Sequence, residues 1–497
     1  MSDSIVKVEN IKKSFGGVKA LKGVSLEIKK GEIHCLAGEN GCGKSTLIKI
    51  ISGFYTADEG SIFFDGVRHL KVTPGEAIRY GVQVIYQDFS VFPNLTVMEN
   101  LALNMELMNN RKIVNYKRFR RIAEEAVSKI DFRVDLDEFV ENLSVADKQL
   151  IAICRALLSN ARLIIMDEPT SALTKKEVKA LFNVIKNLQK QGIAILFVSH
   201  KLDEVFEISE RFTILRNGEN IITGNTCELD SEKFAYYMTG RRFKEEHFKA
   251  ENIEEEPVLE VDNLSLENGY NGVSFKLYRG EILGITGLLG SGRTELVLSI
   301  FGIYPAQSGR IKINGRLVHI DSVKDAIKHG IGYVPADRLT EGLFLPQSVS
   351  RNIAVSKLDQ FSTKLGFLRY KEIDSEIEKW IESLSIATNN ALRPVQTLSG
   401  GNQQKVVLAR WLATDLSILV LNGPTVGVDI GSKYDIHKIL RSLAAKGLAV
   451  IIISDDLPEV LNNCNRILIM RNGRIVSEVK ASETTEKQLA EMATSVS

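Results

Sequence analysis

The feature that most restricts the fold of this chain is the stretch Gly38 to Thr46, which reads GENGCGKST. It follows the apolar run Ile33 to Ala37 and precedes a segment of helical periodicity, so it fits G-x-x-x-x-G-K-[ST] between a strand and a helix. In that setting the glycines let the backbone curl around phosphate, the Lys44 ammonium reaches the β- and γ-phosphates, and the Ser45 hydroxyl is left for Mg²⁺. The expected nucleotide contacts are Gly38, Glu39, Asn40, Gly41, Cys42, Gly43, Lys44, Ser45 and Thr46.

The composition limits the class of protein. At 497 residues the chain is too long for one ordinary core, so at least two domains are expected. A net charge of +1 provides no broad basic surface for nucleic acid. The five cysteines form no C-x-x-C pair, which favours reduced thiols. No apolar run approaches the roughly 18 residues of a membrane span, so we expect no transmembrane segment.

The amino half alternates strands with helices. Strands are expected at 24–28, 33–37, 82–85, 163–166 and 193–198, and helices at 44–52, 146–158 and 175–191. A helical insertion is expected between about 97 and 136. Since several of these strands are apolar on both faces, the pattern predicts a parallel sheet covered by helices.

The carboxyl half repeats this plan. Gly287 lies 249 residues after Gly38 (287 − 38), and Asn422 lies 255 residues after Asp167 (422 − 167). Two constant offsets that differ by six residues indicate one duplicated domain with a small insertion. We expect domains at 1–240 and 258–497, joined by an exposed linker of mixed charge at 241–257.

Two acids end a buried strand in the sequence LIIMDEPT. Asp167 is placed to orient the water shell of Mg²⁺, and Glu168 to activate or position the attacking water. Paired acids can also cap a helix, which is the alternative reading of this pair. Three further candidates carry weaker signals: Gln87 for Mg²⁺, His200 for the γ-phosphate, and Phe15 for stacking on adenine. Because Cys42 lies inside the phosphate loop, a thiol-alkylating reagent is expected to inhibit.

Together, GENGCGKST, Gln87, LIIMDEPT, SALT at Ser171 to Thr174 and His200 resemble the nucleotide-binding domain of ABC transporters. With GLLGSGRTE and TLSGGNQQK in the second copy, the chain is similar to the two-domain ATPase subunits of bacterial importers for ribose, galactose, xylose and related solutes. The resemblance covers essentially the whole chain.

The resemblance implies an architecture and a set of partners. It implies two tandem P-loop NTPase domains of the ABC type, each a RecA-like α/β core with an antiparallel β subdomain and a helical subdomain. Family domains pair head to tail, so Ser399, Gly400 and Gly401 are expected to cover the γ-phosphate of ATP·Mg²⁺ held by the first copy. It also implies two transmembrane permease subunits, an external solute-binding protein, and a peripheral location on the cytoplasmic face of the inner membrane.

Against the family pattern, the second copy departs at nearly every chemical position. Arg293 replaces the loop lysine, and its planar fork is not equivalent to an ammonium. Asn422 and Gly423 replace the two acids, Ala336 replaces the glutamine and Asp455 the histidine. We therefore expect this copy to be close to inactive in hydrolysis.

The signature segments show the opposite asymmetry. The second copy keeps LSGGNQ, whereas the first reads LSVADKQ, in which Val145, Ala146 and Asp147 add bulk and charge. Head-to-tail pairing would unite the intact loop with the intact signature, leaving one working composite ATP site. The alternatives are a soluble tandem ATPase that acts on ribosomes and a regulatory pseudo-ATPase, and the identity of the solute stays open.

Overall fold

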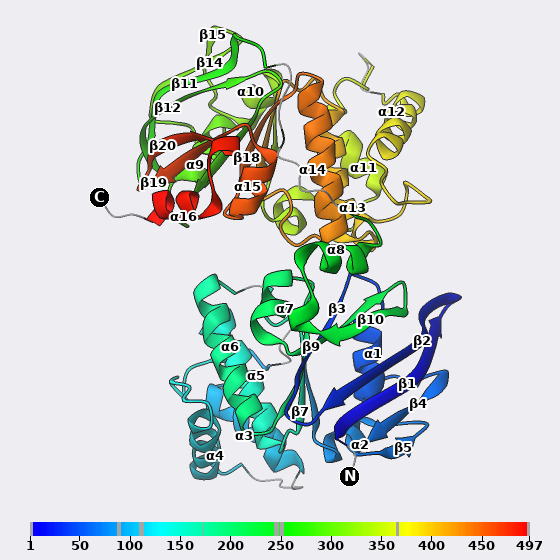
Figure 1. Cartoon of the computed structure of the whole chain (residues 1–497). Helices are drawn as coiled ribbons and strands as arrows, with labels where there is room; N and C mark the ends of the chain where they lie inside the picture. Colours follow the sequence, from blue (N-terminus) through cyan, green and yellow to red (C-terminus); the bar gives the residue numbers. More distant parts are fainter. Residues whose placement is uncertain are drawn as a thin grey trace. The chain divides into compact units, whose positions relative to one another are not determined.

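A computed structural model describes residues 3–86, 91–108, 114–171, 173–242, 248, 253–363 and 367–494. The chain forms two compact units, Met1–Phe243 and Lys244–Ser497 (Figure 1). Each unit has its own sheets, helices and buried apolar cluster. Among the described residues, no helix combines the length and the apolar character needed to cross a membrane.

The first unit is built on a six-stranded sheet in the order β10-β9-β3-β8-β7-β6. Its strands are β3 (Ile33–Gly38), β6 (Val82–Ile85), β7 (Leu163–Asp167), β8 (Ala194–Val198), β9 (Arg211–Arg216) and β10 (Glu219–Asn225). All neighbours are parallel except β9 and β10. Strands β3 and β8 are buried along their whole length, which explains their continuous apolar sequences.

An antiparallel sheet in the order β2-β1-β4-β5 accompanies this core. Its strands are β1 (Ser4–Phe15), β2 (Val18–Lys29), β4 (Glu59–Phe64) and β5 (Val67–His69). The strand expected at 24–28 is therefore longer than predicted. Its first part carries exposed lysines and lacks an apolar run, but it pairs with β1 in a hairpin.

Eight α-helices are described in the first unit. They are α1 (Lys44–Ile51), α2 (Pro74–Arg79), α3 (Val97–Met108), α4 (Tyr116–Ser128), α5 (Val145–Leu158), α6 (Lys175–Lys190), α7 (Leu202–Ile208) and α8 (Ser231–Thr239). Helices α3, α4 and α5 enclose a separate apolar cluster that includes Leu101, Phe119 and Ile151. This is the helical insertion that the sequence predicted.

The second unit repeats the topology, with sheets in the orders β16-β17-β18-β13-β19-β20 and β12-β11-β14-β15. Its strands are β11 (Pro257–Leu266), β12 (Tyr270–Tyr278), β13 (Ile282–Gly287), β14 (Ser308–Ile313), β15 (Arg316–Val318), β16 (Ile331–Val334), β17 (Ile418–Asn422), β18 (Ala449–Ile453), β19 (Arg466–Arg471) and β20 (Arg474–Lys480). The larger sheet matches that of the first unit strand for strand.

The α-helices described in the second unit are α9 (Arg293–Ile300), α10 (Val323–Lys328), α11 (Val349–Ala354), α12 (Tyr370–Ser383), α13 (Gly400–Leu412), α14 (Ile430–Ala445), α15 (Leu457–Asn463) and α16 (Glu486–Thr494). Within this unit, α11 and α12 lie on the side opposite the antiparallel sheet (Figure 1). The duplicated domain inferred from the residue offsets is thus present as two copies of one fold.

Candidate active site

The loop between β3 and α1 has the conformation that phosphate binding requires. Gly38, Gly41 and Gly43 have φ angles of 158°, 81° and 108°. A Cβ atom on Gly38 would lie 2.5 Å from the Leu215 carbonyl oxygen, and one on Gly43 would lie 2.8 Å from that of Ala20. Side chains at these two positions would therefore collide with backbone, so the tight curl of the loop depends on glycine.

The Lys44 ammonium lies inside this curl. It donates hydrogen bonds to the carbonyl oxygens of Gly38 (2.6 Å) and Glu39 (3.0 Å), and the residue is 6% exposed. The positive charge is thus held in place by weak, neutral acceptors. An anion that entered the loop would offer the ammonium a stronger, charged partner.

The two acids after β7 lie in different surroundings. Asp167 accepts a hydrogen bond from the Ser45 hydroxyl over 3.3 Å. Burial, and then the charge of Glu168, raise the pKa of Asp167 above its usual value. A cation at this point would stabilise the ionised form of Asp167. The Ser45 and Asp167 oxygens fit Mg²⁺, which prefers a few oxygen ligands and keeps several waters.

Glu168 points to the neighbouring strand end. Its backbone is left-handed (φ 48°), and its N–H donates to the Val198 carbonyl oxygen over 3.1 Å. Its carboxylate lies 3.1 Å from His200 Nδ1, and this hydrogen bond lowers the pKa of Glu168 despite the opposing effect of burial. Glu168 is therefore ionised and oriented. The capping alternative is not needed, since Thr174 caps α6.

A buried glutamate that the sequence reasoning missed holds these strand ends together. Glu204 accepts hydrogen bonds from Thr170 (2.6 Å) and Ser199 (2.5 Å), which follow Glu168 and precede His200. In the second unit, Thr425 and Ser454 bond to Glu459 in the same way. The signal was available in the sequence, because all three residues recur at the offset of 255.

The remaining predicted residues of the first unit are Phe15 and Gln87. Phe15 ends β1, is 41% exposed, and packs against Tyr55 with ring centroids 5.2 Å apart. Its face is thus partly accessible, and its stacking on adenine stays a prediction. Gln87 lies outside the described residues.

Cys42 gives a correction to the expected thiol chemistry. The residue is 4% exposed, and burial raises the pKa of its thiol. Since the thiolate is the reactive form, Cys42 is a poor target at neutral pH, contrary to the expectation from its place in the loop. Cys227 is exposed and is the more accessible thiol.

The two signature segments differ in how their helices begin. Ser144 caps α5 by accepting a hydrogen bond from the Asp147 N–H (3.1 Å), and its hydroxyl donates to the Asp147 carboxylate (2.7 Å). Ser399 starts α13 without a side-chain cap, and its hydroxyl accepts only from Asn402 (2.8 Å) among the described residues. The first signature thus has a carboxylate where an anion would have to approach, and the second does not.

The glycines of the second signature lie close to their neighbours. A Cβ on Gly401 would collide with the Ser432 side chain of α14, and one on Gly400 would lie 2.6 Å from Arg338. These glycines therefore have a packing role inside the second unit, in addition to the phosphate contact expected of them.

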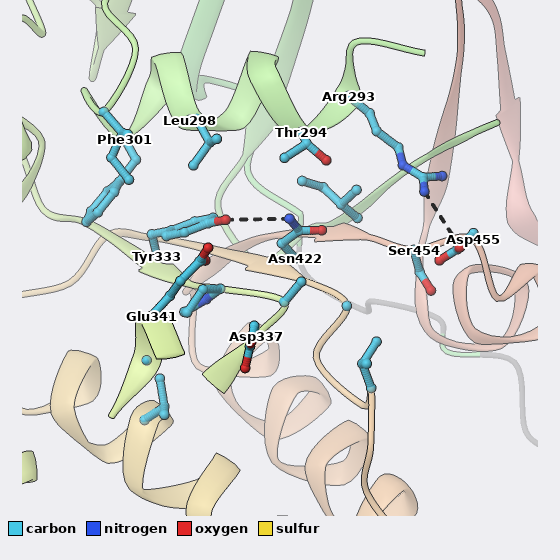
Figure 2. Close-up of a pocket in the computed structure, with 18 of the residues that line it drawn as sticks. Arg293, Thr294, Leu298, Phe301, Tyr333, Asp337, Glu341, Asn422, Ser454 and Asp455 are labelled. Atoms are coloured by element: carbon cyan, nitrogen blue, oxygen red, sulfur yellow. Dashed lines mark hydrogen bonds and ion pairs between the residues drawn. The ribbon is translucent and has the colours of Figure 1, made fainter. Parts of the chain in front are cut away.

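The second unit's equivalent of the catalytic centre has different chemistry (Figure 2). Arg293 donates a hydrogen bond from one guanidinium nitrogen, Nη1, to the Gly287 carbonyl oxygen. Its other terminal nitrogen, Nη2, lies 3.8 Å from the Asp455 carboxylate. Asn422 donates to the Tyr333 hydroxyl over 3.5 Å. Gly423 supplies no side chain in the place of Glu168.

A cavity of about 680 Å³ adjoins these residues, entirely within the second unit. Leu298, Phe301 and Tyr333 line it beside Asn422 (Figure 2). At the offset of 249, Phe301 and Leu298 correspond to Ser52 and Lys49 of the first unit. Apolar side chains thus stand at these two positions, where the first unit has polar ones.

Comparison with known proteins gives a consistent result. The ABC transporter family model matches residues 21–171 and 270–426. The chain is 43% identical over 495 residues to the ribose import ATP-binding protein of Clostridium perfringens (strain SM101), covering 99% of this chain and 98% of that protein. It is 39% identical over 490 residues to the galactose/methyl galactoside import ATP-binding protein of Fusobacterium nucleatum, covering 98% of each.

A solved structure of ribosome-bound archaeal Pelota and ABCE1 matches 97% of this chain and 80% of its own, with a TM-score of 0.62. The sequence identity is 20%, so this likeness shows the fold alone.

Proposed function

The chain belongs to the ABC transporter family as an ATP-binding subunit of a sugar importer, and we propose that it hydrolyses ATP at one site, built on its first unit. The observation that carries this proposal is the convergence of Lys44, Ser45, Asp167, Glu168 and His200 at one edge of the first unit's sheet. The second unit has a different residue at each equivalent position.

Each of these side chains has a separate role in the proposed hydrolysis. Lys44 exchanges the Gly38 carbonyl for the β- and γ-phosphates. Ser45 and Asp167 would hold Mg²⁺, with Gln87 as a further expected ligand, and the bound ion would supply positive charge to the phosphate oxygens. Glu168, ionised beside His200, positions and activates the attacking water, while His200 reaches the γ-phosphate.

We infer that Ser399, Gly400 and Gly401 complete this site, as head-to-tail pairing in the family implies. The free start of α13 supports the inference, because Ser399 is exposed and no carboxylate caps its helix. The second site, with Arg293 and Gly423, should not hydrolyse ATP at a useful rate. Losing a general base alone costs about 10²- to 10⁴-fold.

The partners proposed follow from the family. They are two transmembrane permease subunits and, through them, a solute-binding protein, with the ATPase peripheral on the cytoplasmic face of the inner membrane. The solute is ribose, galactose or a related compound. Action on ribosomes finds no support, since the likeness to ribosome-bound ABCE1 has 20% identity and shows the fold alone.

Reconstitution with the permease tests this function. Vesicles that contain the complex should take up a radiolabelled sugar and release phosphate in parallel. Ser399→Arg should abolish both activities, because it blocks the proposed approach of the signature to the γ-phosphate. Ser144→Arg, at the equivalent position of the other signature, is the matched control and should leave most hydrolysis in place. Equal loss in both variants would contradict the assignment of one working site.

A further inference from the structure

The second loop has kept its shape although its chemistry has changed. Gly287, Gly290 and Gly292 have φ angles of 158°, 78° and 89°, close to those of the first loop. Packing explains two of them, since a Cβ on Gly287 or Gly292 would collide with backbone carbonyls. A Cβ on Gly290 would meet nothing within 4 Å. The loop therefore retains a curled backbone that can surround an anion.

An unpaired hydroxyl lies within this loop. Ser291 is 4% exposed, and its Oγ has no hydrogen-bond partner among the described residues. A buried hydroxyl without a partner is unfavourable, and it is a donor that a bound oxyanion could use. Together with the N-terminus of α9 that follows it, Ser291 indicates that the loop still takes phosphate.

The cation of this loop already has an anionic partner. Arg293 occupies the position from which a loop lysine reaches the β- and γ-phosphates, and Asp455 lies 3.8 Å from its guanidinium. Lys44, by comparison, bonds to two carbonyl oxygens. Asp455 takes the place of His200, the residue proposed to reach the γ-phosphate in the first unit, so a third phosphate would meet a like charge here.

The carboxylate expected to hold Mg²⁺ is also missing. Asn422 is neutral and donates its amide to Tyr333, and Gly423 has no side chain. Among the described residues at this point, Thr294 is the only equivalent of the first unit's Ser45 and Asp167 that carries a hydroxyl or a carboxylate. A triphosphate would enter without the Mg²⁺ that normally bridges its β- and γ-phosphates.

We propose that the second loop is a binding site for a nucleoside diphosphate taken up without Mg²⁺, and that Asp455 excludes the γ-phosphate. Arg293, Ser291 and the start of α9 bind the two phosphates, while Asp455 serves as an internal substitute for the third. This inference rests on the proposed function in one respect, because it assumes that hydrolysis occurs at the loop of the first unit. The second site would then hold ADP steadily while the first site turns over.

Equilibrium binding to the full chain tests this proposal. In a Lys44→Ala background, which disables the first loop, a fluorescent N-methylanthraniloyl (mant) derivative of ADP should bind once per chain. Its affinity should exceed that of mant-ATP by about tenfold or more, since like charges repel at short range. Excess EDTA should leave mant-ADP binding unchanged, whereas binding at a magnesium-dependent loop would be lost.

Two variants in that background assign the selectivity. Asp455→Asn should tighten mant-ATP binding and reduce the preference for ADP to about threefold or less. Glu341→Gln removes an exposed acid from the rim of the same cavity and is the matched control, so its preference for ADP should be unchanged. Arg293→Ala should abolish mant-ADP binding and thereby confirms the location.

Four results would overturn the proposal. Three of them are mant-ATP binding as tight as mant-ADP, a requirement for Mg²⁺, and mant-ADP binding that survives Arg293→Ala. Absence of mant-ADP binding in the Lys44→Ala chain, with a folded circular dichroism spectrum, would also overturn it. Phosphate release by the unmutated complex is measured in parallel. If this complex released no phosphate, the result would contradict the proposed function and not the diphosphate site.

Discussion

Asp167 and Glu168 are neighbours in the sequence but have opposite electrostatic settings. Burial raises the pKa of Asp167, whereas the hydrogen bond from His200 lowers that of Glu168. The motif predicted that both acids follow directly on a buried strand, and their roles stay predictions. It could not predict the left-handed backbone at Glu168, which turns this side chain to His200. Nor could it predict that Tyr333 would bind Asn422 in the second unit.

Removing His200 should shift the pH dependence of hydrolysis. With His200 present, the pKa of Glu168 is lowered. The carboxylate therefore stays ionised at pH values below the pKa of an ordinary glutamate. In His200→Ala only burial and weaker charges remain, so Glu168 becomes protonated at a higher pH. The acid limb of the kcat profile should therefore move upward. An unchanged acid limb would show that another group controls it.

Thiol modification should distinguish two cysteines. Cys227 is exposed, whereas the buried Cys42 has a raised thiol pKa. One equivalent of N-ethylmaleimide at pH 7 should therefore label Cys227 first and leave ATP hydrolysis nearly intact. Peptide mass mapping identifies the labelled residue. Rapid inactivation of the Cys227→Ser variant, with label on Cys42, would refute the low reactivity assigned here.

At the scale of elements, the sequence predicted the buried parallel strands more closely than the antiparallel ones. Strand β8 begins and ends within one residue of its expected range, because every residue in it is buried. Strands β4, β5, β9 and β10 were not expected. Strand β4 is partly buried and pairs with the distant β1, whereas β5 and β10 contain no buried residue and are edge strands that pair with their chain neighbours β4 and β9. Edge strands with so few buried side chains have no apolar pattern from which they could be predicted.

In each unit a buried glutamate, Glu204 or Glu459, joins two strand ends by hydrogen bonds. The ionisation of this glutamate should affect the free energy of unfolding. Burial alone would raise the pKa of Glu459, but His437, Lys433 and Ser454 outweigh it and hold the pKa at about 2. A lowered pKa stabilises the fold above the unfolded value, near 4.5, and this contribution is lost as the pH falls toward 2.

Glu459→Gln should therefore be destabilising at pH 7, on the order of 2–3 kcal/mol. The difference from the unmutated chain should shrink progressively below about pH 4.5. Thermal unfolding of both proteins at pH 7, 5 and 4 measures it, with the exposed Glu382→Gln as control. A difference that grows as the pH falls would have the wrong sign for this account.

At the scale of the whole molecule, the two copies of the domain differ in complementary ways. The first unit keeps the lysine and the acids but has Asp147 in its signature, and the second keeps the signature but has lost the acids. The constant residue offsets predicted two copies of one domain, and the two matching sheets confirm it. The relation between the units is not encoded in any local pattern, so the composite site remains a proposal based on family pairing.

The central claim is that only the acid of the first unit supports hydrolysis, and one pair of variants tests it most directly. Phosphate release by the complex with its permease is compared for Glu168→Gln and Gly423→Glu. Both residues are left-handed, with φ angles of 48° and 56°, so the second site can present a glutamate once Val426 yields. Glu168→Gln should lower kcat about 100-fold or more, whereas Gly423→Glu should change it by less than about twofold. A large gain from Gly423→Glu, or substantial turnover in Glu168→Gln, would contradict a single working site.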